Sequence, residues 1–122
     1  MYNILICDDE QDIVNALKIY LSGGDYCLFE AHNGREALEA VEKNDIHLIL
    51  MDIMMPEMDG LEATRTIRNL DREDCKKIPI YAMSANAFDE DVKRSLASGM
   101  NGHLSKPVNL QVLEKTLQKV LG

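Results

Sequence analysis

Short apolar runs alternate along the chain with stretches in which apolar residues recur at helical spacing. The first run, Tyr2–Cys7, is rich in Ile and Leu and stops at three consecutive acidic residues. Ile13, Leu17 and Tyr20 follow at helical spacing, and the small residues Ser22-Gly23-Gly24 end that pattern. A strand followed directly by a helix is therefore the first predicted unit.

The same alternation repeats to the end of the chain. Four further apolar runs predict strands at Tyr26–Ala31, Ile46–Met51, Ile78–Met83 and Gly102–Ser105. Four further helices are predicted around Ala37–Val41, from Gly60 to Leu70, over Phe88–Leu96 and over Leu110–Val120, the last capped by Asn109. The charged stretch Asp71–Lys77 is predicted to be a polar loop.

Five strands alternating with five helices at such short spacings predict parallel strands joined by right-handed crossovers. The expected architecture is a doubly wound α/β fold, with helices on both faces of one sheet. The chain contains no internal repeat, low-complexity tract or linker. A single domain over residues 1–122 is therefore expected.

Composition narrows the class of partner and the compartment. The formal charge of −8 argues against direct contact with nucleic acid or with an anionic membrane surface. No apolar run is long enough to span a bilayer. Cys7, Cys27 and Cys75 are odd in number and match no metal-ligand spacing, which predicts reduced thiols in a cytoplasmic protein.

Polar residues collect where the predicted strands end. Asp8 and Asp9 follow the first strand, Asp52 the third, Ser84 the fourth and Lys106 the fifth. In a doubly wound sheet the carboxyl ends of parallel strands open on one edge, where ligands bind. These five side chains are therefore expected to converge from distant positions in the sequence.

Their chemistry favours phosphoryl transfer. Carboxylates crowded together repel one another unless a cation lies among them, and an all-oxygen site suits Mg²⁺. Lys106 adds a second positive charge, so that a carboxylate could approach a phosphoryl group. Asp52 is the predicted nucleophile because the turn after it exposes its oxygens, whereas Asp8 and Asp9 are better placed to hold the metal.

Each of these residues also has a purely structural interpretation. Asp8 and Asp9 could cap the helix that follows them, and Asp52 could start a turn. Ser84 could cap a helix, and Lys106 could be a solvated surface charge. The functional interpretation rests on all of them ending four strands on one edge of the sheet.

Four motifs resemble the receiver domain of two-component response regulators over essentially the whole chain. They are Asp8-Asp9, the segment Asp52–Gly60, the turn Met83-Ser84-Ala85 and Lys106-Pro107. The run from Gly99 to Pro107 looks most like receivers attached to hybrid histidine kinases. The resemblance implies a flavodoxin-like fold with strand order 2-1-3-4-5.

For the site, the resemblance implies that Asp52 accepts phosphate from a phosphohistidine on a histidine kinase or a histidine phosphotransfer domain. Asp9 and Asp52 would bind Mg²⁺ directly, together with the backbone carbonyl of Met54. Asp8 would assist, partly through water. Lys106 would pair with the phosphoryl group.

The resemblance further implies a cis bond before Pro107 and a movement of Ser84 toward the phosphate that carries the signal onward. The family often has Tyr or Phe three residues before the lysine, as a switch residue, whereas this chain has His103. We expect His32 and His47 to lie away from the active edge.

Met55 is expected to contact a partner, because flexible thioethers adapt to a partner surface. The favoured function is a phosphorylation-controlled binding module that turns over no external substrate. An Mg²⁺-dependent phosphohydrolase is the alternative, weakened because position 54 is Met rather than a second acid. A phosphorylation-independent scaffold of the same fold is a third possibility.

Overall fold

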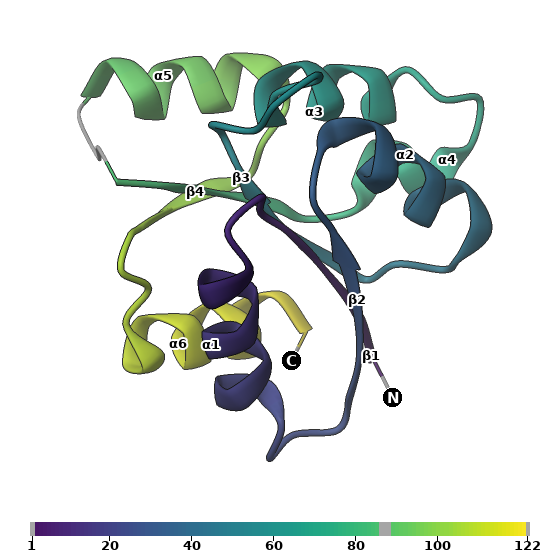
Figure 1. The fold of residues 1–122 in the computed structure, drawn as a ribbon. Helices are drawn as coiled ribbons and strands as arrows, with labels where there is room; N and C mark the ends of the chain where they lie inside the picture. The colour runs from purple at the N-terminus through teal and green to yellow at the C-terminus, as the bar shows by residue number, and fades with distance from the viewer. Residues whose placement is uncertain (1, 86–88, 122) are drawn as a thin grey trace.

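The computed structural model describes residues 2–85 and 89–121, which form a five-stranded parallel sheet between two layers of helices (Figure 1). The strand order is β2-β1-β3-β4-β5, which confirms the predicted topology. The strands are β1 (Tyr2–Cys7), β2 (Tyr26–Ala31), β3 (Leu48–Asp52), β4 (Ile80–Ser84) and β5 (Gly102–Ser105).

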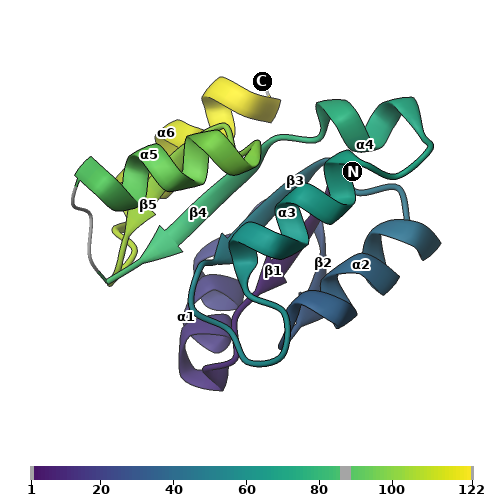
Figure 2. The same cartoon turned by 90° about the horizontal axis from the view of Figure 1, so that it is seen from above.

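Helices cover both faces of the sheet, with α1 and α6 on one face and α2, α3 and α5 on the other (Figures 1 and 2). The helices are α1 (Gln11–Leu21), α2 (Gly34–Lys43), α3 (Gly60–Arg68), α4 (Glu73–Lys77), α5 (Asp89–Ser98) and α6 (Leu110–Leu121). None of the helices in the described ranges is long and apolar enough to cross a membrane.

Side chains alternate between the two faces of the sheet and so build two apolar clusters. On β3, Leu48 and Leu50 pack with the α1 and α6 side, whereas Ile49 and Met51 pack with the α2 and α3 side. All five residues of β3 are buried. This burial on both faces explains why the sequence of β3 is almost continuously apolar until Asp52.

Three helices begin at side-chain caps that the sequence carries. The Asn33 side chain accepts a hydrogen bond from the Glu36 N–H (2.9 Å), and Asp59 accepts one from the Glu62 N–H (2.8 Å). Asn109 accepts hydrogen bonds from backbone N–H groups at the start of α6 (2.8 and 3.3 Å), as predicted. These caps satisfy backbone donors that would otherwise lack partners.

The prediction of five helices was wrong, because the stretch expected to be a polar loop contains α4. This short helix has no apolar stripe, and hydrogen bonds from arginine side chains hold it in place. Arg68 donates to the Cys75 carbonyl (3.0 Å), and Arg72 donates to the Val41 carbonyl of α2 (2.9 Å). Strands β3 and β4 also begin two residues later than predicted, at Leu48 and Ile80.

Of the apolar stripe predicted for α5, Leu96 does not face the core. Leu96 is 52% exposed, whereas Ser95 and Ser98 are 1% and 4% exposed. Val92 is half-buried, and Phe88 lies outside the described residues. The helix therefore presents serines rather than leucine to the body of the domain.

Candidate functional site

The carboxyl ends of the strands meet at one edge of the sheet and bring the predicted site residues together. Cys7 is level with Met51 in the β1–β3 pair. Asp8 and Asp52 are the next residues after these two, so they come at the same level where the two neighbouring strands end. Ser84 is level with Ser105 in the β4–β5 pair, and the Lys106 N–H donates to the Ser84 carbonyl (2.9 Å). This backbone register places all five predicted residues along the same edge.

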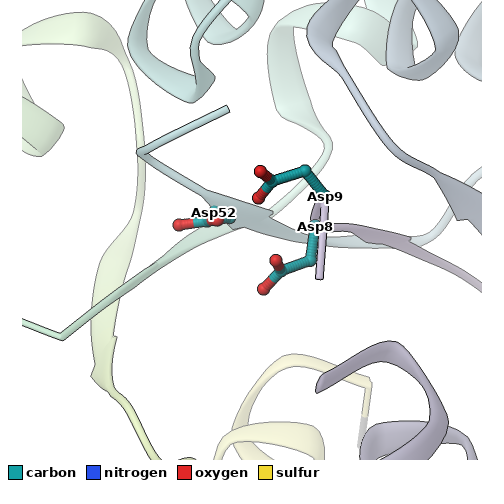
Figure 3. A group of neighbouring side chains, drawn as sticks. All are labelled: Asp8, Asp9 and Asp52. Carbon is teal, nitrogen blue, oxygen red and sulfur yellow. The ribbon is translucent and has the colours of Figure 1, made fainter. Parts of the chain in front are cut away.

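Asp8, Asp9 and Asp52 gather where β1 and β3 end (Figure 3). Each can offer one carboxylate oxygen such that all three oxygens lie within 4.8 Å of one another. Asp8 is fully buried, Asp52 is 3% exposed and Asp9 is exposed. Two acids of the cluster are therefore buried, and Asp9 is the one that solvent reaches.

The ammonium group of Lys106 bridges two of these acids. Its Nζ lies 2.7 Å from Asp8 Oδ2 and 3.2 Å from Asp52 Oδ2. The Lys106 side chain is only 11% exposed, so it is not a solvated surface charge. Burial lowers the pKa of Lys106, but its contact with Asp8 and the charges of Asp52 and Asp8 outweigh burial and raise that pKa.

Asp52 carries an excess of negative charge that Lys106 only partly compensates. Burial, followed by the charge of Asp8, raises the pKa of Asp52 to about 6 against an ordinary value of 3.8. Lys106 and the Met54 N–H, which donates to Asp52 Oδ1 (3.1 Å), act in the opposite direction. A second cation at this site would relieve the remaining repulsion.

The loop after Asp52 is folded back tightly against the end of β3. The Gly60 N–H donates to the Ile53 carbonyl (3.0 Å), and a β-carbon at Gly60 would lie 2.2 Å from the Asp52 carbonyl oxygen. Only glycine fits there without moving the backbone that carries Asp52. Gly60 therefore holds the loop in place as well as opening α3.

The methionines of this loop do not lie as expected. Met55 is 8% exposed and belongs to the apolar core on the α2 and α3 side, so the predicted partner contact at Met55 was wrong. Met54 is the exposed residue, at 77%. Sequence alone could not separate these neighbours, because both lie in an irregular loop without periodicity.

Ser84 and His103 lie on the adjacent strands β4 and β5, Ser84 at the carboxyl edge and His103 two residues before it. Ser84 is 6% exposed at the end of β4. His103 is half-buried on β5, level with Ala82, and its Nε2 atom is buried without a hydrogen-bond partner among the described residues. A buried nitrogen without a partner is a costly arrangement that invites a functional explanation.

The expectation for the other two histidines was half right. His32 follows β2 at the carboxyl edge, which corrects its predicted placement, but its ring contacts Gln11 (3.0 Å) and Glu36 (3.2 Å) rather than the three aspartates. His47 precedes β3 at the opposite edge and accepts a hydrogen bond from the Asn3 N–H (2.9 Å).

The structure also tests the alternative that Asp8 and Asp9 cap the helix that follows them. The residue that caps α1 is Glu10, and no side chain hydrogen-bonds to the helix start as a cap. Asp8 Oδ1 instead accepts a hydrogen bond from the Glu10 N–H (2.9 Å), while its other oxygen faces Lys106. The peptide bond between Lys106 and Pro107 is cis, as the family resemblance implies.

Comparison with known proteins places this arrangement in a family. The family model described as "Response regulator receiver domain" matches residues 4–118. The sensor histidine kinase RcsC of Salmonella typhimurium is 40% identical over 114 residues, which cover 93% of this chain and 12% of that protein. The chain spans between 6% and 16% of the length of the first curated relatives that it matches, several of them histidine kinases.

Solved structures agree in fold. The chemotaxis protein CheY4 of Vibrio cholerae superposes with a TM-score of 0.91 at 32% identity, over 98% of each chain. The receiver domain of Ssk1, solved with the histidine phosphotransfer protein Ypd1 of Saccharomyces cerevisiae, gives 0.90 at 31% identity, over 98% of this chain and 88% of that one. The chain thus belongs to the response regulator receiver domains, the phosphorelay signalling modules of two-component systems.

Proposed function

We propose that Asp52 is the phosphoacceptor of this receiver domain and takes its phosphoryl group from a phosphohistidine. The observation that carries the proposal is the double ion pair of Lys106 with Asp8 and Asp52. This double ion pair holds a cation beside a buried carboxylate at the end of a strand. Phosphoryl transfer needs such positioning and such neutralisation of charge. A carboxylate oxygen of Asp52 forms the new bond to phosphorus while the bond to the donor imidazole nitrogen breaks.

The donor set fits Mg²⁺. Three carboxylates with oxygens within 4.8 Å of one another form a hard, all-oxygen site. Burial and then the negative charge of Asp8 raise the pKa of Asp52, and a divalent cation would offset that charge. Asp9 and Asp52 would hold the ion directly with the Met54 backbone carbonyl, and Asp8 would assist, partly through water. When bound, the ion supplies neutralisation of the carboxylates and of the incoming phosphoryl oxygens.

The remaining site residues stabilise and report the phosphorylated state. Lys106 exchanges its contact with Asp52 for the phosphoryl oxygens and keeps Asp8 as its partner. Ser84 moves toward the phosphoryl group and passes the change into α5, β5 and α6. His103 acts as the switch residue on β5, and a partner for its unpaired Nε2 becomes available when the ring moves.

The donor is a histidine kinase or a histidine phosphotransfer domain. The co-crystal of Ypd1 with a receiver domain, and histidine kinases among the relatives, support this assignment. The domain turns over no external substrate and acts through a protein partner or an attached output domain. Three free cysteines, with no disulfide among them, support a reducing compartment such as the cytoplasm.

A phosphodonor experiment tests the proposal. Incubation with acetyl phosphate and Mg²⁺ should add one phosphate by intact mass to the wild-type domain and none to Asp52→Asn. Asp71→Asn is the matched control, because Asp71 is exposed in the turn before α4, away from the acidic cluster, and it should be phosphorylated as wild type is. An unmodified wild-type mass, or a phosphorylated Asp52→Asn, would contradict the assignment.

A further inference from the structure

His32 lies at the carboxyl edge of the sheet, where the strand next to β1 ends. Ala31 is level with Cys7 in the β1–β2 pair, and the Ala31 carbonyl accepts a hydrogen bond from the Asp8 N–H (3.0 Å). His32 is the next residue after that strand, so its side chain starts beside the loop that carries the acidic cluster. The proposed phosphoryl transfer gives this side chain no role.

The ring of His32 lies between α1 and α2. Its Nε2 atom is 3.0 Å from Oε1 of Gln11, the first residue of α1. Its Nδ1 atom is 3.2 Å from Oε1 of Glu36, which belongs to the first turn of α2. The same Glu36 oxygen accepts a hydrogen bond from the His32 backbone N–H (2.9 Å). One side chain therefore connects the beginnings of two helices.

The partners on both sides of the ring are hydrogen-bond acceptors. The Gln11 amide nitrogen donates to the Glu30 carboxylate (3.3 Å), which can only accept, so the amide oxygen is the atom that faces His32. Both ring contacts are hydrogen bonds when each ring nitrogen carries a hydrogen, as in the protonated imidazole. The charged groups around the ring are Glu36, Glu30 (4.0 Å from Nε2) and Lys18, which pairs with Glu30 (2.8 Å).

The beginning of α1 lacks a side-chain cap. Glu10 stands at the cap position, and its side chain makes no capping hydrogen bond. Asp9 and Glu10 are both exposed, and Gln11 follows them directly in the sequence. The contact between Gln11 and His32 therefore restrains the segment that carries Asp9.

The beginning of α2, by contrast, is seated against the loop that follows Asp52. The Gly34 N–H donates to the Met58 carbonyl (3.0 Å), and a β-carbon at Gly34 would lie 2.5 Å from that carbonyl oxygen. Such a close approach is possible because glycine has no side chain. His32 therefore links the uncapped segment with Asp9 to an element that is fixed on the loop after Asp52.

We propose that His32 is a positioning residue for the metal site. By joining the beginning of α1 to α2, it keeps Asp9 within reach of an ion bound at Asp52. The inference rests on the proposed function, in which Asp9 and Asp52 both bind Mg²⁺. Residues that orient ligands without touching the ion raise its affinity by holding the ligands in place, so the contribution of His32 is measured as Mg²⁺ affinity.

Mg²⁺ titrations by isothermal calorimetry, at about pH 6 where a histidine is ordinarily protonated, test the proposal. His32→Ala should weaken Mg²⁺ binding about three- to fivefold, the equivalent of one hydrogen bond. Because the His32 side chain is 42% exposed, the melting temperature in EDTA should stay within about 3 °C of wild type. His32→Arg should keep the affinity within about twofold of wild type, because a guanidinium can donate to both acceptors. Equal affinity of His32→Ala and wild type would overturn the proposal.

His47→Ala is the matched control. The His47 side chain is similarly exposed (36%), but it accepts a hydrogen bond from the Asn3 N–H at the opposite edge of the sheet. This variant should bind Mg²⁺ as wild type does. An equal weakening in His47→Ala and His32→Ala would show a general effect on stability and contradict the positioning role.

Gln11→Ala removes the other end of the same contact. It should weaken Mg²⁺ binding about as much as His32→Ala, and the double variant should be no weaker than about fivefold, because both changes break one link. Independent effects would multiply to roughly nine- to 25-fold, which would contradict the link. Should His32→Ala not fold, Gln11→Ala carries the test, and its affinity must then fall below that of wild type for the proposal to stand.

A metal-free measurement separates this inference from the proposed function. The Ile13 and Val14 N–H groups donate to the Glu10 carbonyl in the first turn of α1 (3.1 and 3.2 Å). In EDTA, these two amides should exchange about three- to fivefold faster in His32→Ala than in wild type, and unchanged exchange would refute the link whatever the ion does.

The two failures have different signatures. A wild type that binds Mg²⁺ no better than His32→Ala would refute the positioning role alone. A wild type that binds no Mg²⁺ would refute the metal site of the proposed function and the positioning role with it.

Discussion

Helices α3 and α5 lie side by side on one face of the sheet, yet they are attached by different forces. Ile67 of α3 is fully buried with Leu61 and Ala63, whereas the leucine of α5 faces solvent and its serines face inward. Apolar burial holds α3 along its whole length. At the carboxyl end of α5, a hydrogen bond from Arg68 of α3 to the Gly99 carbonyl joins the two helices.

The contrast matches the division of labour at the carboxyl edge. Asp52 precedes α3, and Gly60 locks the connecting loop against the Asp52 backbone. Ser84 precedes α5, whose fully buried residues in the described part of the helix are Ser95 and Ser98. The proposed function requires a fixed acceptor at Asp52 and a movable reporter at Ser84, and the apolar attachment of α3 supports the first of these requirements.

The largest expected difference between the two helices is in core truncation. Ile67→Ala should lower the free energy of unfolding by about 2–5 kcal/mol, because it leaves a cavity in close-packed surroundings. Leu96→Ala should change it by no more than about 0.5 kcal/mol. Urea denaturation of the two variants measures both values.

A loss above about 2 kcal/mol in Leu96→Ala would mean that α5 buries its leucine in solution. The contrast between the helices would then fail. The Gly23→Ala variant provides a baseline, because a β-carbon there meets no atom within 4 Å.

The pH dependence of stability should distinguish Asp52 from acids outside the site. Its folded pKa of about 6 lies above the ordinary 3.8, so the folded protein keeps a proton that the unfolded chain releases. The stabilisation is therefore present below about pH 4 and is lost as the pH rises through 6. At 1.36 kcal/mol per unit, the loss approaches about 3 kcal/mol as an upper bound.

Urea titrations in EDTA between pH 4 and 7 check this prediction. The stability of wild type relative to Asp52→Asn should fall across that range, whereas the difference between wild type and Asp71→Asn should stay nearly flat. A wild type that gains stability relative to Asp52→Asn as the pH rises would show that Lys106 outweighs burial and Asp8.

The residues of the site were predictable because they end strands. Strand periodicity and length place Asp8, Asp52, Ser84 and Lys106 at the ends of strands. The parallel topology then brings those strand ends to one edge of the sheet. The bridging of Asp8 and Asp52 by one ammonium was not predictable, because it depends on where the Lys106 side chain folds back. Proximity follows from backbone register, but pairing follows from side-chain packing.

The errors arose where local pattern and tertiary contact disagree. Val92 and Leu96 share a helical face, but Leu96 is exposed, and the end of the helix is fixed by the turn at Gly99 and by one hydrogen bond from Arg68, which periodicity does not contain. Helix α4 has no apolar stripe; it is held by one buried side chain, Cys75, and by arginine hydrogen bonds to backbone carbonyls, one of which joins Arg72 to Val41. Hydrogen bonds between residues about 30 positions apart leave no signal in one sequence.

The smallest expected effect concerns the binding of Mg²⁺ to the fixed side of the edge. At tenfold the dissociation constant, Mg²⁺ should raise the free energy of unfolding by about 1.4 kcal/mol, or roughly 5 °C in melting temperature for a domain of this size. Asp9→Ala should abolish the rise, because Asp9 is the exposed acid of the cluster and a proposed direct ligand.

Asp12→Ala is the control, an exposed acid in the first turn of α1 that is not part of the cluster, and it should keep the full response. The two variants should be compared by calorimetric melting with Mg²⁺ and with EDTA. An equal Mg²⁺ response in both would place the ion elsewhere, and an equal response of Leu96→Ala and wild type would show that binding stabilises the domain without involving α5.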